Sequence, residues 1–88
     1  MIVSILFSGD AMEYRLRIRD LREDADLSQT DVAQELGIDQ RTYSNYETEK
    51  RDMPMKHYRK LAIFYKTSVD YLIGLTDEHR PYPRAKRK

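Results

Sequence analysis

The chain has 88 residues, which limits it to one domain near the lower size limit for a single hydrophobic core. It contains no cysteine, so disulfides and thiolate metal sites are excluded. The net charge of +1 does not by itself indicate binding to a polyanion. Residues 12–79 are slightly acidic, whereas residues 80–88 carry five cations. A polyanion could therefore bind only to a local cluster of cations on the domain or to this tail.

The first eleven residues differ in composition from the rest of the chain. Residues 2–7 form a mostly apolar run that is too short to span a bilayer and lacks a basic stretch before it, which argues against a secretory signal. Three interpretations stay open for residues 1–11. The segment is an arm that pairs across a dimer, a segment packed on the domain, or an extension from an upstream start codon with Met12 as the natural start.

Helical periodicity follows immediately after this extension. Tyr14, Ile18, Leu21 and Ala25 are spaced to form one apolar stripe, which predicts a first helix that ends near Asp26. No alternating strand pattern occurs after the first seven residues, so the sequence predicts an all-α domain.

Two short helices are predicted on either side of Gly37, which occupies the position of a left-handed residue after a helix. Ser28 is placed as the N-cap of the first of them, with Asp31 completing a capping box. Asp39 is placed as the N-cap of the next one. The predicted buried positions are Val32, Ala33, Leu36, Ile38, Tyr43 and Tyr46.

A fourth and a fifth helix are predicted after this pair. Pro54 is suited to the start of the fourth helix, and Ser68 to the N-cap of a short fifth helix that ends near Gly74. The predicted buried positions of these helices are Tyr58, Leu61, Ala62, Tyr65, Val69 and Leu72. Pro81 and Pro83 favour an irregular tail after the last helix.

The face of the third helix that points away from Tyr43 and Tyr46 is polar and almost uncharged. A solvated helix face more often carries pairs of Glu and Lys. Arginine is suited to guanine, and Gln and Asn are suited to adenine, through two hydrogen bonds to one base edge. The outward residues are Gln40, Arg41, Ser44, Asn45 and Thr48.

The stretch from Ile18 to Leu75 resembles the Cro/phage-repressor class of helix-turn-helix domains, the xenobiotic-response-element family. The resemblance is carried by "LRED", "LSQTDVAQELGI", "TYSNYE" and "KLAIFYKTSVDYLIGL". It implies a compact five-helix bundle of the lambda-repressor-like type over residues 12–79. It also implies a homodimer that occupies a palindromic operator in double-stranded DNA and represses transcription in the cytoplasm, and we expect residues 1–11 to be dispensable for this binding.

The resemblance also implies roles for individual residues. The base-reading positions are Gln40, Arg41 and Asn45, with Ser44 on the same face, and the phosphate contacts are Gln29, Thr48, Lys50 and Arg51. Arg22 and Glu47 match a charged pair that ties the first helix to the end of the third. We place the dimer surface on the fifth helix and the residues after it, with Tyr71, Ile73 and Leu75.

The sequence departs from the family pattern in two loops. Glu49 stands where glycine is usual, and a positive φ there is unfavourable for a side chain. Asp26 also replaces a common glycine, although aspartate tolerates the left-handed region better than most residues. Some relatives carry basic residues where this chain has Asp52, Met53 and Met55, which leaves Lys50 and Arg51 as the main phosphate partners of the loop.

Catalysis and metal binding are not expected. His57 and His79 are far apart in the sequence and have no further ligand at metal spacing, and no catalytic triad pattern is present. We therefore predict no enzyme activity, cofactor, metal or membrane association. The alternative function is an antitoxin-type interaction protein, which blocks a protein partner (a toxin or an anti-repressor) and regulates its own gene through the same DNA-binding domain. In that case either the basic tail, residues 80–88, or the N-terminal arm binds and blocks the partner. The tail is also a candidate for a nonspecific contact with the phosphate backbone.

Overall fold

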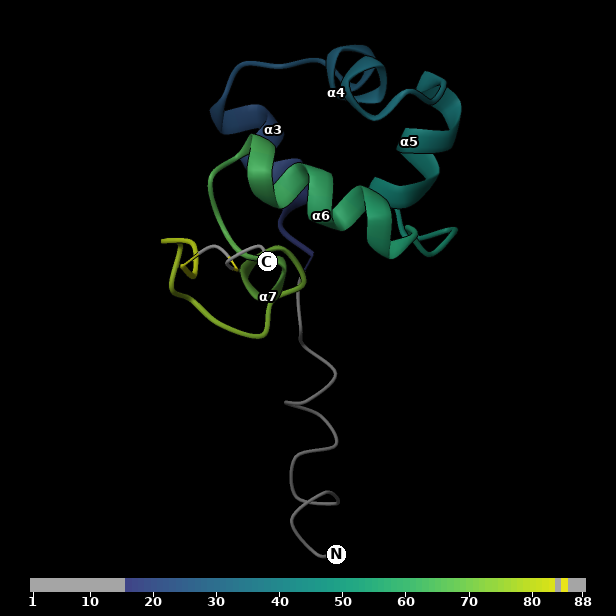
Figure 1. Cartoon of the computed structure of the whole chain (residues 1–88). Helices are drawn as coiled ribbons and strands as arrows, with labels where there is room; N and C mark the ends of the chain where they lie inside the picture. The colour runs from purple at the N-terminus through teal and green to yellow at the C-terminus, as the bar shows by residue number, and fades with distance from the viewer. Residues whose placement is uncertain (1–15, 84, 86–88) are drawn as a thin grey trace, which may run out of the picture.

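The computed structural model describes residues 16–83 and 85, which contain five helices and no strand (Figure 1). The helices are α3 Ile18–Asp24, α4 Gln29–Leu36, α5 Gln40–Glu47, α6 Met55–Phe64 and α7 Val69–Leu72. In Figure 1, α6 runs across the middle of the domain, with α4 and α5 above it and α7 below it. The predicted all-α, five-helix fold is confirmed. The extension 1–11, residues 12–15 with the predicted stripe residue Tyr14, and residues 84 and 86–88 of the tail lie outside the described residues.

Local hydrogen bonds fix the ends of α4 and α5 as the sequence predicts. The Asp31 amide donates to Ser28 Oγ at 3.0 Å, and the Ser28 amide donates to Asp31 Oδ2 at 2.8 Å, which completes the capping box. Asp39 Oδ1 accepts from the Thr42 amide at 2.7 Å. Gly37 has φ = 73°, so α4 ends in the left-handed conformation that lets α5 begin three residues after this glycine.

The core lies between α4, α5 and α6 and extends to α3 and α7. Four of the described residues are completely buried: Val32, Tyr43, Leu61 and Leu72. Burial of their apolar surface stabilises the packed helices, because a single short helix is not stable alone in water. The buried apolar residues are Ile18, Val32, Ala33, Leu36, Tyr43, Tyr46, Met53, Leu61, Ala62 and Leu72. Ile38, Tyr58, Tyr65 and Val69 pack against this cluster as half-buried residues.

The structure differs from the sequence prediction at three core positions. Ala25 is exposed, because α3 ends at Asp24 and the chain turns away before the predicted stripe is complete. Met53 and His57 are buried, although the pattern assigned neither to the core. The His57 ring lies 6.1 Å from the Tyr46 ring, and burial together with the charges of Lys56 and Lys60 lowers its pKa.

Within residues 16–83 and 85, three residues other than glycine adopt positive φ, each just after a helix. The values are 58° for Asp26, 60° for Glu49 and 57° for Lys66. The left-handed conformation at Asp26 and Glu49 agrees with the family pattern, in which glycine is common at both places. The positive φ of Lys66 was not predicted. This conformation ends α6 and allows the Thr67 amide to donate to the Ala62 carbonyl at 2.8 Å.

Lys66→Gly is expected to raise the free energy of unfolding by about 0.5–1 kcal/mol, because glycine adopts this φ without the steric penalty of a side chain. Lys60→Gly is the matched control, since Lys60 is an exposed lysine inside α6, the helix that Lys66 follows, and glycine inside a helix costs about 1 kcal/mol. Urea denaturation of both variants measures the two changes. Destabilisation by both substitutions would show that the left-handed conformation at Lys66 carries no strain.

Arg17, just before α3, forms hydrogen bonds with α7 and with the segment that follows α7. Its guanidinium donates to the carbonyls of Tyr71 at 2.9 Å and Thr76 at 2.5 Å and to Asp77 Oδ1 at 2.5 Å. It also lies 4.2 Å from the centre of the Tyr71 ring, whose edge contacts His79 at a centroid distance of 5.0 Å. Tyr71 is therefore engaged within the chain, which leaves Leu75, 52% exposed, as the most accessible residue of the expected dimer surface.

Candidate nucleic-acid interface

The outward face of α5 carries polar side chains that are free to contact a partner. Gln40 and Arg41 are exposed, whereas Ser44 and Asn45 are half-buried on the same side of the helix. Within the described part of the chain, the side chains of Arg41 and Asn45 form no hydrogen bond or ion pair. The Thr48 hydroxyl donates to the Ser44 carbonyl at 3.0 Å, which secures the last turn of α5.

Gln40 is oriented by a hydrogen bond that crosses from α5 to α4. Gln40 Nε2 donates to Gln29 Oε1 at 2.5 Å, and Gln29 Nε2 donates to Glu47 Oε1 at 3.0 Å. Gln40 keeps its own Oε1 and its second amide hydrogen, the acceptor and donor that an adenine edge requires. Residue spacing does not predict this link, because the two glutamines are eleven positions apart and on different helices.

Arg22 and Glu47 join α3 to the end of α5 through two hydrogen bonds. Arg22 Nε donates to Glu47 Oε2 at 2.6 Å, and Arg22 Nη2 donates to Glu47 Oε1 at 3.1 Å. Arg22 Nη1 also donates to the Leu27 carbonyl at 2.9 Å. The side chains are 12% and 2% exposed, respectively, so this pair lies inside the domain. Together with Gln29 it forms a continuous network behind the outward face of α5.

The network lies beside two buried tyrosine hydroxyls. Neither Tyr43 Oη nor Tyr65 Oη has a hydrogen-bond partner among the described residues. Burial and the nearby charge of Glu47 raise the pKa of Tyr43 far above its usual value, and the same causes raise the pKa of Tyr65 to about 12. Both hydroxyls therefore stay protonated at neutral pH, and neither adds a negative charge beside Glu47.

The hydrogen bonds of Glu47 make the stability of the domain depend on pH. Burial alone would raise the pKa of this carboxyl, but hydrogen bonds from Arg22 and Gln29 and the charge of Arg22 outweigh it and lower the pKa. A lowered pKa stabilises the folded state fully above the unfolded-state pKa, about 4.3 for Glu. That contribution is lost as the pH falls through the lower, folded-state pKa.

We therefore expect the wild-type chain to have a higher free energy of unfolding than Glu47→Gln at neutral pH. The difference between the two free energies should shrink as the pH falls below about 4.3. Other carboxyl groups are present in both proteins, so their effects cancel in the difference. Denaturant unfolding of both proteins from pH 7 to pH 3 measures it. A margin that is constant over this range would contradict the lowered pKa of Glu47.

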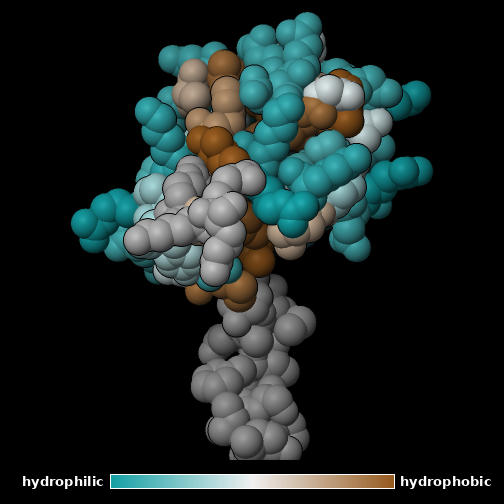
Figure 2. Space-filling view, in the orientation of Figure 1, coloured by the Kyte–Doolittle hydropathy of each residue, from teal (hydrophilic) through white to brown (hydrophobic). Residues whose placement is uncertain are grey.

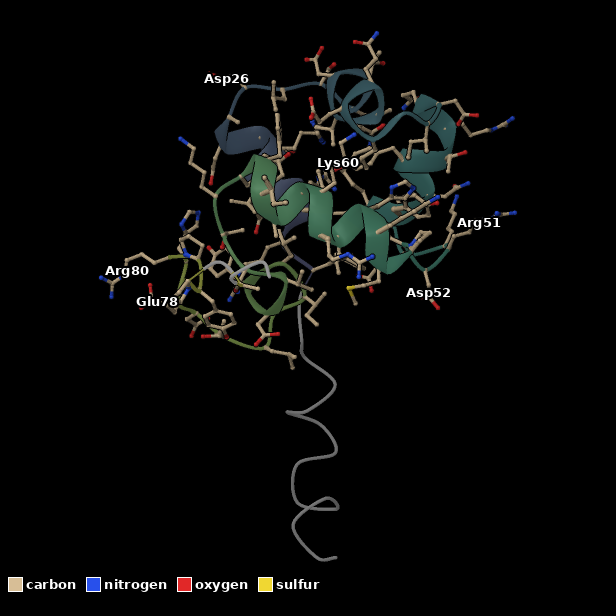
Figure 3. All side chains as sticks on the ribbon, in the orientation of Figure 1. Asp26, Arg51, Asp52, Lys60, Glu78 and Arg80 are labelled. Carbon is tan, nitrogen blue, oxygen red and sulfur yellow. The ribbon has the colours of Figure 1, made fainter. Side chains whose placement is uncertain are left out.

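The connection between α5 and α6 presents the loop cations. The backbone amides of Lys50 and Arg51 both donate to the Asn45 carbonyl, at 2.9 Å and 3.2 Å, so the loop turns back against α5. Both side chains are exposed, and Figure 3 shows Arg51 extending into solvent beside Asp52. Glu49 and Asp52 flank these two cations, which limits the positive charge that the loop offers to a phosphate backbone.

Arg80, the first cation of the tail, does not extend this surface. It is paired with Glu78, whose Oε2 accepts from Arg80 Nε at 3.1 Å. Figure 3 shows Glu78 and Arg80 on the opposite side of the domain from Arg51. The other four cations of the tail all lie outside the described residues: Arg84, Lys86, Arg87 and Lys88.

Neither a metal site nor a membrane-spanning helix is found in the described part of the chain. Residues 16–83 and 85 contain no group of three or more His, Cys, Asp or Glu side chains that could hold a metal ion. No helix there combines the length and apolar character needed to cross a membrane.

Two short helices packed through a glycine turn, with a polar outer face on the second, define the helix-turn-helix class of DNA-binding domains. Comparison with protein families matches residues 18–72 to the family described as Helix-turn-helix. The chain belongs to this family, and its relatives carry the names of transcriptional regulators and of a phage repressor, in agreement with the Cro/phage-repressor resemblance.

Three curated relatives illustrate the similarity. The "Uncharacterized HTH-type transcriptional regulator YobD" of Bacillus subtilis (strain 168) is 39% identical over 75 residues, which cover 85% of this chain and 65% of the relative. The HTH-type transcriptional regulator ImmR of the same organism is 36% identical over 58 residues, 66% of this chain and 46% of the relative. The cryptic phage CTXphi transcriptional repressor RstR of Vibrio cholerae is 37% identical over 58 residues, 66% of this chain and 52% of the relative.

The chain thus spans between about half and two thirds of the length of these relatives. No solved structure gave a significant match.

Proposed function

We propose that the chain is a sequence-specific DNA-binding transcriptional repressor that acts as a homodimer on a palindromic operator in the cytoplasm. The observation that carries this proposal is the outward face of α5, where Arg41 and Asn45 are unpaired within the described residues and Gln40 is held by Gln29. Such side chains match the donor and acceptor pattern of base edges in the major groove. The names of the relatives, which include a phage repressor, favour repression over the antitoxin-type alternative.

The network behind α5 supports the proposed role, because base readout needs side chains that are already in position. Arg22 and Glu47 hold the end of α5 against α3, and Gln29 connects this pair to Gln40. The proposed phosphate contacts, Gln29, Thr48, Lys50 and Arg51, lie at the start of α4 and after α5, on either side of the base-reading residues. In this arrangement one domain contacts the backbone on both sides of one major groove.

Two such domains are required for tight and specific binding. One domain offers few cations, and its loop cations are flanked by acidic residues, so its affinity at physiological salt is expected to be modest. A two-fold symmetric dimer presents two α5 helices to successive major grooves, about 34 Å apart along the DNA. We place the dimer surface near Leu75 and Ile73 at the end of α7.

Selection of bound sequences from a random duplex library is expected to recover a palindrome whose half-sites are about 10–10.5 base pairs apart from centre to centre. The proposed function predicts this spacing because the two recognition helices are related by two-fold symmetry. Light scattering of the complex with the selected duplex should give two chains per operator.

Recovery of no sequence above the starting pool would contradict sequence-specific binding. One chain per operator would contradict the dimer alone, and it would leave the base-reading residues to be tested separately.

A further inference from the structure

A cavity of about 290 Å³ lies on the side of the domain formed by the second half of α6 and the start of α7. Its third wall is the segment after α7, which loops back beside that helix, green to yellow in Figure 1. The walls are mostly apolar and include Ala62, Ile63, Val69 and Pro83. Ile63 is 60% exposed, and the face shown in Figure 2 has apolar patches between its hydrophilic side chains. None of the proposed DNA contacts lines this cavity.

Hydrogen bonds hold the returning segment in place. The Thr67 hydroxyl donates to the His79 carbonyl at 2.6 Å, and the Tyr82 hydroxyl donates to Asp70 Oδ2 at 2.8 Å. Thr67 is buried, so its bond fixes the segment from the inner side, and the Tyr82 bond closes the outer side. The third wall is therefore built into the fold.

Two opposite charges line the cavity without meeting. Arg59 and Asp70 both contribute to its wall, but they form no ion pair with each other. Within the described residues Arg59 has no hydrogen-bond partner or ion-pair partner at all. Asp70 uses Oδ2 for Tyr82, which leaves Oδ1 free to accept a further hydrogen bond. A ligand that spans these groups must therefore offer an anion to Arg59 and a donor to Asp70.

We infer that this cavity binds a free α-amino acid with an apolar side chain, such as leucine or phenylalanine. The α-carboxylate pairs with the Arg59 guanidinium, the α-ammonium donates to Asp70, and the side chain packs against Ile63 and Val69. A simple carboxylic acid would leave Asp70 beside a second negative charge, and a simple amine would leave Arg59 unpaired. The cavity volume of about 290 Å³ is just below the usual range for small-molecule sites, about 300–1,000 Å³, which suits a ligand as small as a single amino acid.

Titration of the full chain with L-phenylalanine, followed by amide NMR shifts, tests this inference without DNA. We expect saturable shifts at Ile63, Val69, Asp70 and Tyr82. Two probes that each lack one charged group, hydrocinnamate and phenethylamine, should bind about fivefold or more weakly, because each loses one ion pair. This comparison uses only the unmodified protein, so it does not depend on the folding of any variant.

Arg59→Gln and Asp70→Asn should each weaken the binding of L-phenylalanine to a similar extent. Lys56→Gln is the matched control, since Lys56 is an exposed cation of the same helix that does not line the cavity. It should leave the affinity unchanged. The inference is overturned if no saturable shift appears up to about 10 mM L-phenylalanine, since the dissociation constant would then exceed the millimolar range. Equal affinity for the three probes would also overturn it, because the charges would then make no contribution.

Discussion

Arg22→Ala is expected to lower the free energy of unfolding by about 3–5 kcal/mol, the loss typical of breaking one side of a buried ion pair. The Glu47 side chain is 2% exposed and accepts two hydrogen bonds from Arg22, so the substitution leaves a buried carboxylate with only Gln29 as a side-chain donor. The Leu27 carbonyl also loses its bond to Arg22. Urea denaturation at neutral pH measures this change.

Arg19→Ala is the matched control for this variant. Arg19 pairs with Glu23 at 3.2 Å on the same helix, but these side chains are 65% and 53% exposed. Removal of this exposed pair should cost about 0–1 kcal/mol. The double variant Arg22→Met/Glu47→Leu should recover much of the stability, because it removes both buried charges together. Equal effects of Arg22→Ala and Arg19→Ala would show that burial of the Arg22–Glu47 pair contributes nothing.

Arg41→Ala is expected to weaken operator binding by roughly 1–3 kcal/mol per half-site and to relax the preference at one base pair, most simply a guanine. The expectation follows from the position of Arg41, which is exposed on the outer face of α5 with its guanidinium unpaired within residues 16–83 and 85. Affinity for a scrambled duplex should change little, since nonspecific binding depends on phosphate contacts.

Lys50→Ala is expected to behave differently. It should weaken binding to the operator and to the scrambled duplex alike, and it should reduce the salt dependence by about one phosphate contact per half-site. Binding of both variants to both duplexes at several salt concentrations separates the two roles. An equal loss on both duplexes for Arg41→Ala, together with a loss on the operator alone for Lys50→Ala, would reverse the assignments.

The parts of the fold that sequence predicts well depend on hydrogen bonds and burial within a few residues. Ser28 and Asp39 each cap a helix through the amide three residues later, so the pattern contains both partners. The burial of Tyr43 and Tyr46 likewise follows from their spacing on one helix. These local features position α4 and α5, and with them the outward face that forms the candidate site.

Features that depend on distant partners did not follow from the spacing of residues along the chain. Met53 lies in a connection without periodicity, and its burial depends on how α5 and α6 pack. Arg17 makes its contacts with residues more than fifty positions away. The link between Gln29 and Gln40 requires the crossing of two helices, which spacing alone does not specify. The Arg22–Glu47 pair is also distant in sequence, and only the family resemblance indicated it.

The central claim is that α5 reads base edges in the major groove, and a crystal structure of the chain bound to its selected duplex tests it most directly. We predict that α5 lies in the groove, with Gln40, Arg41 and Asn45 within hydrogen-bond distance of base edges, and that the Gln29–Gln40 bond persists in the complex. A complex in which α5 faces solvent and another surface of the domain contacts the DNA would contradict the claim.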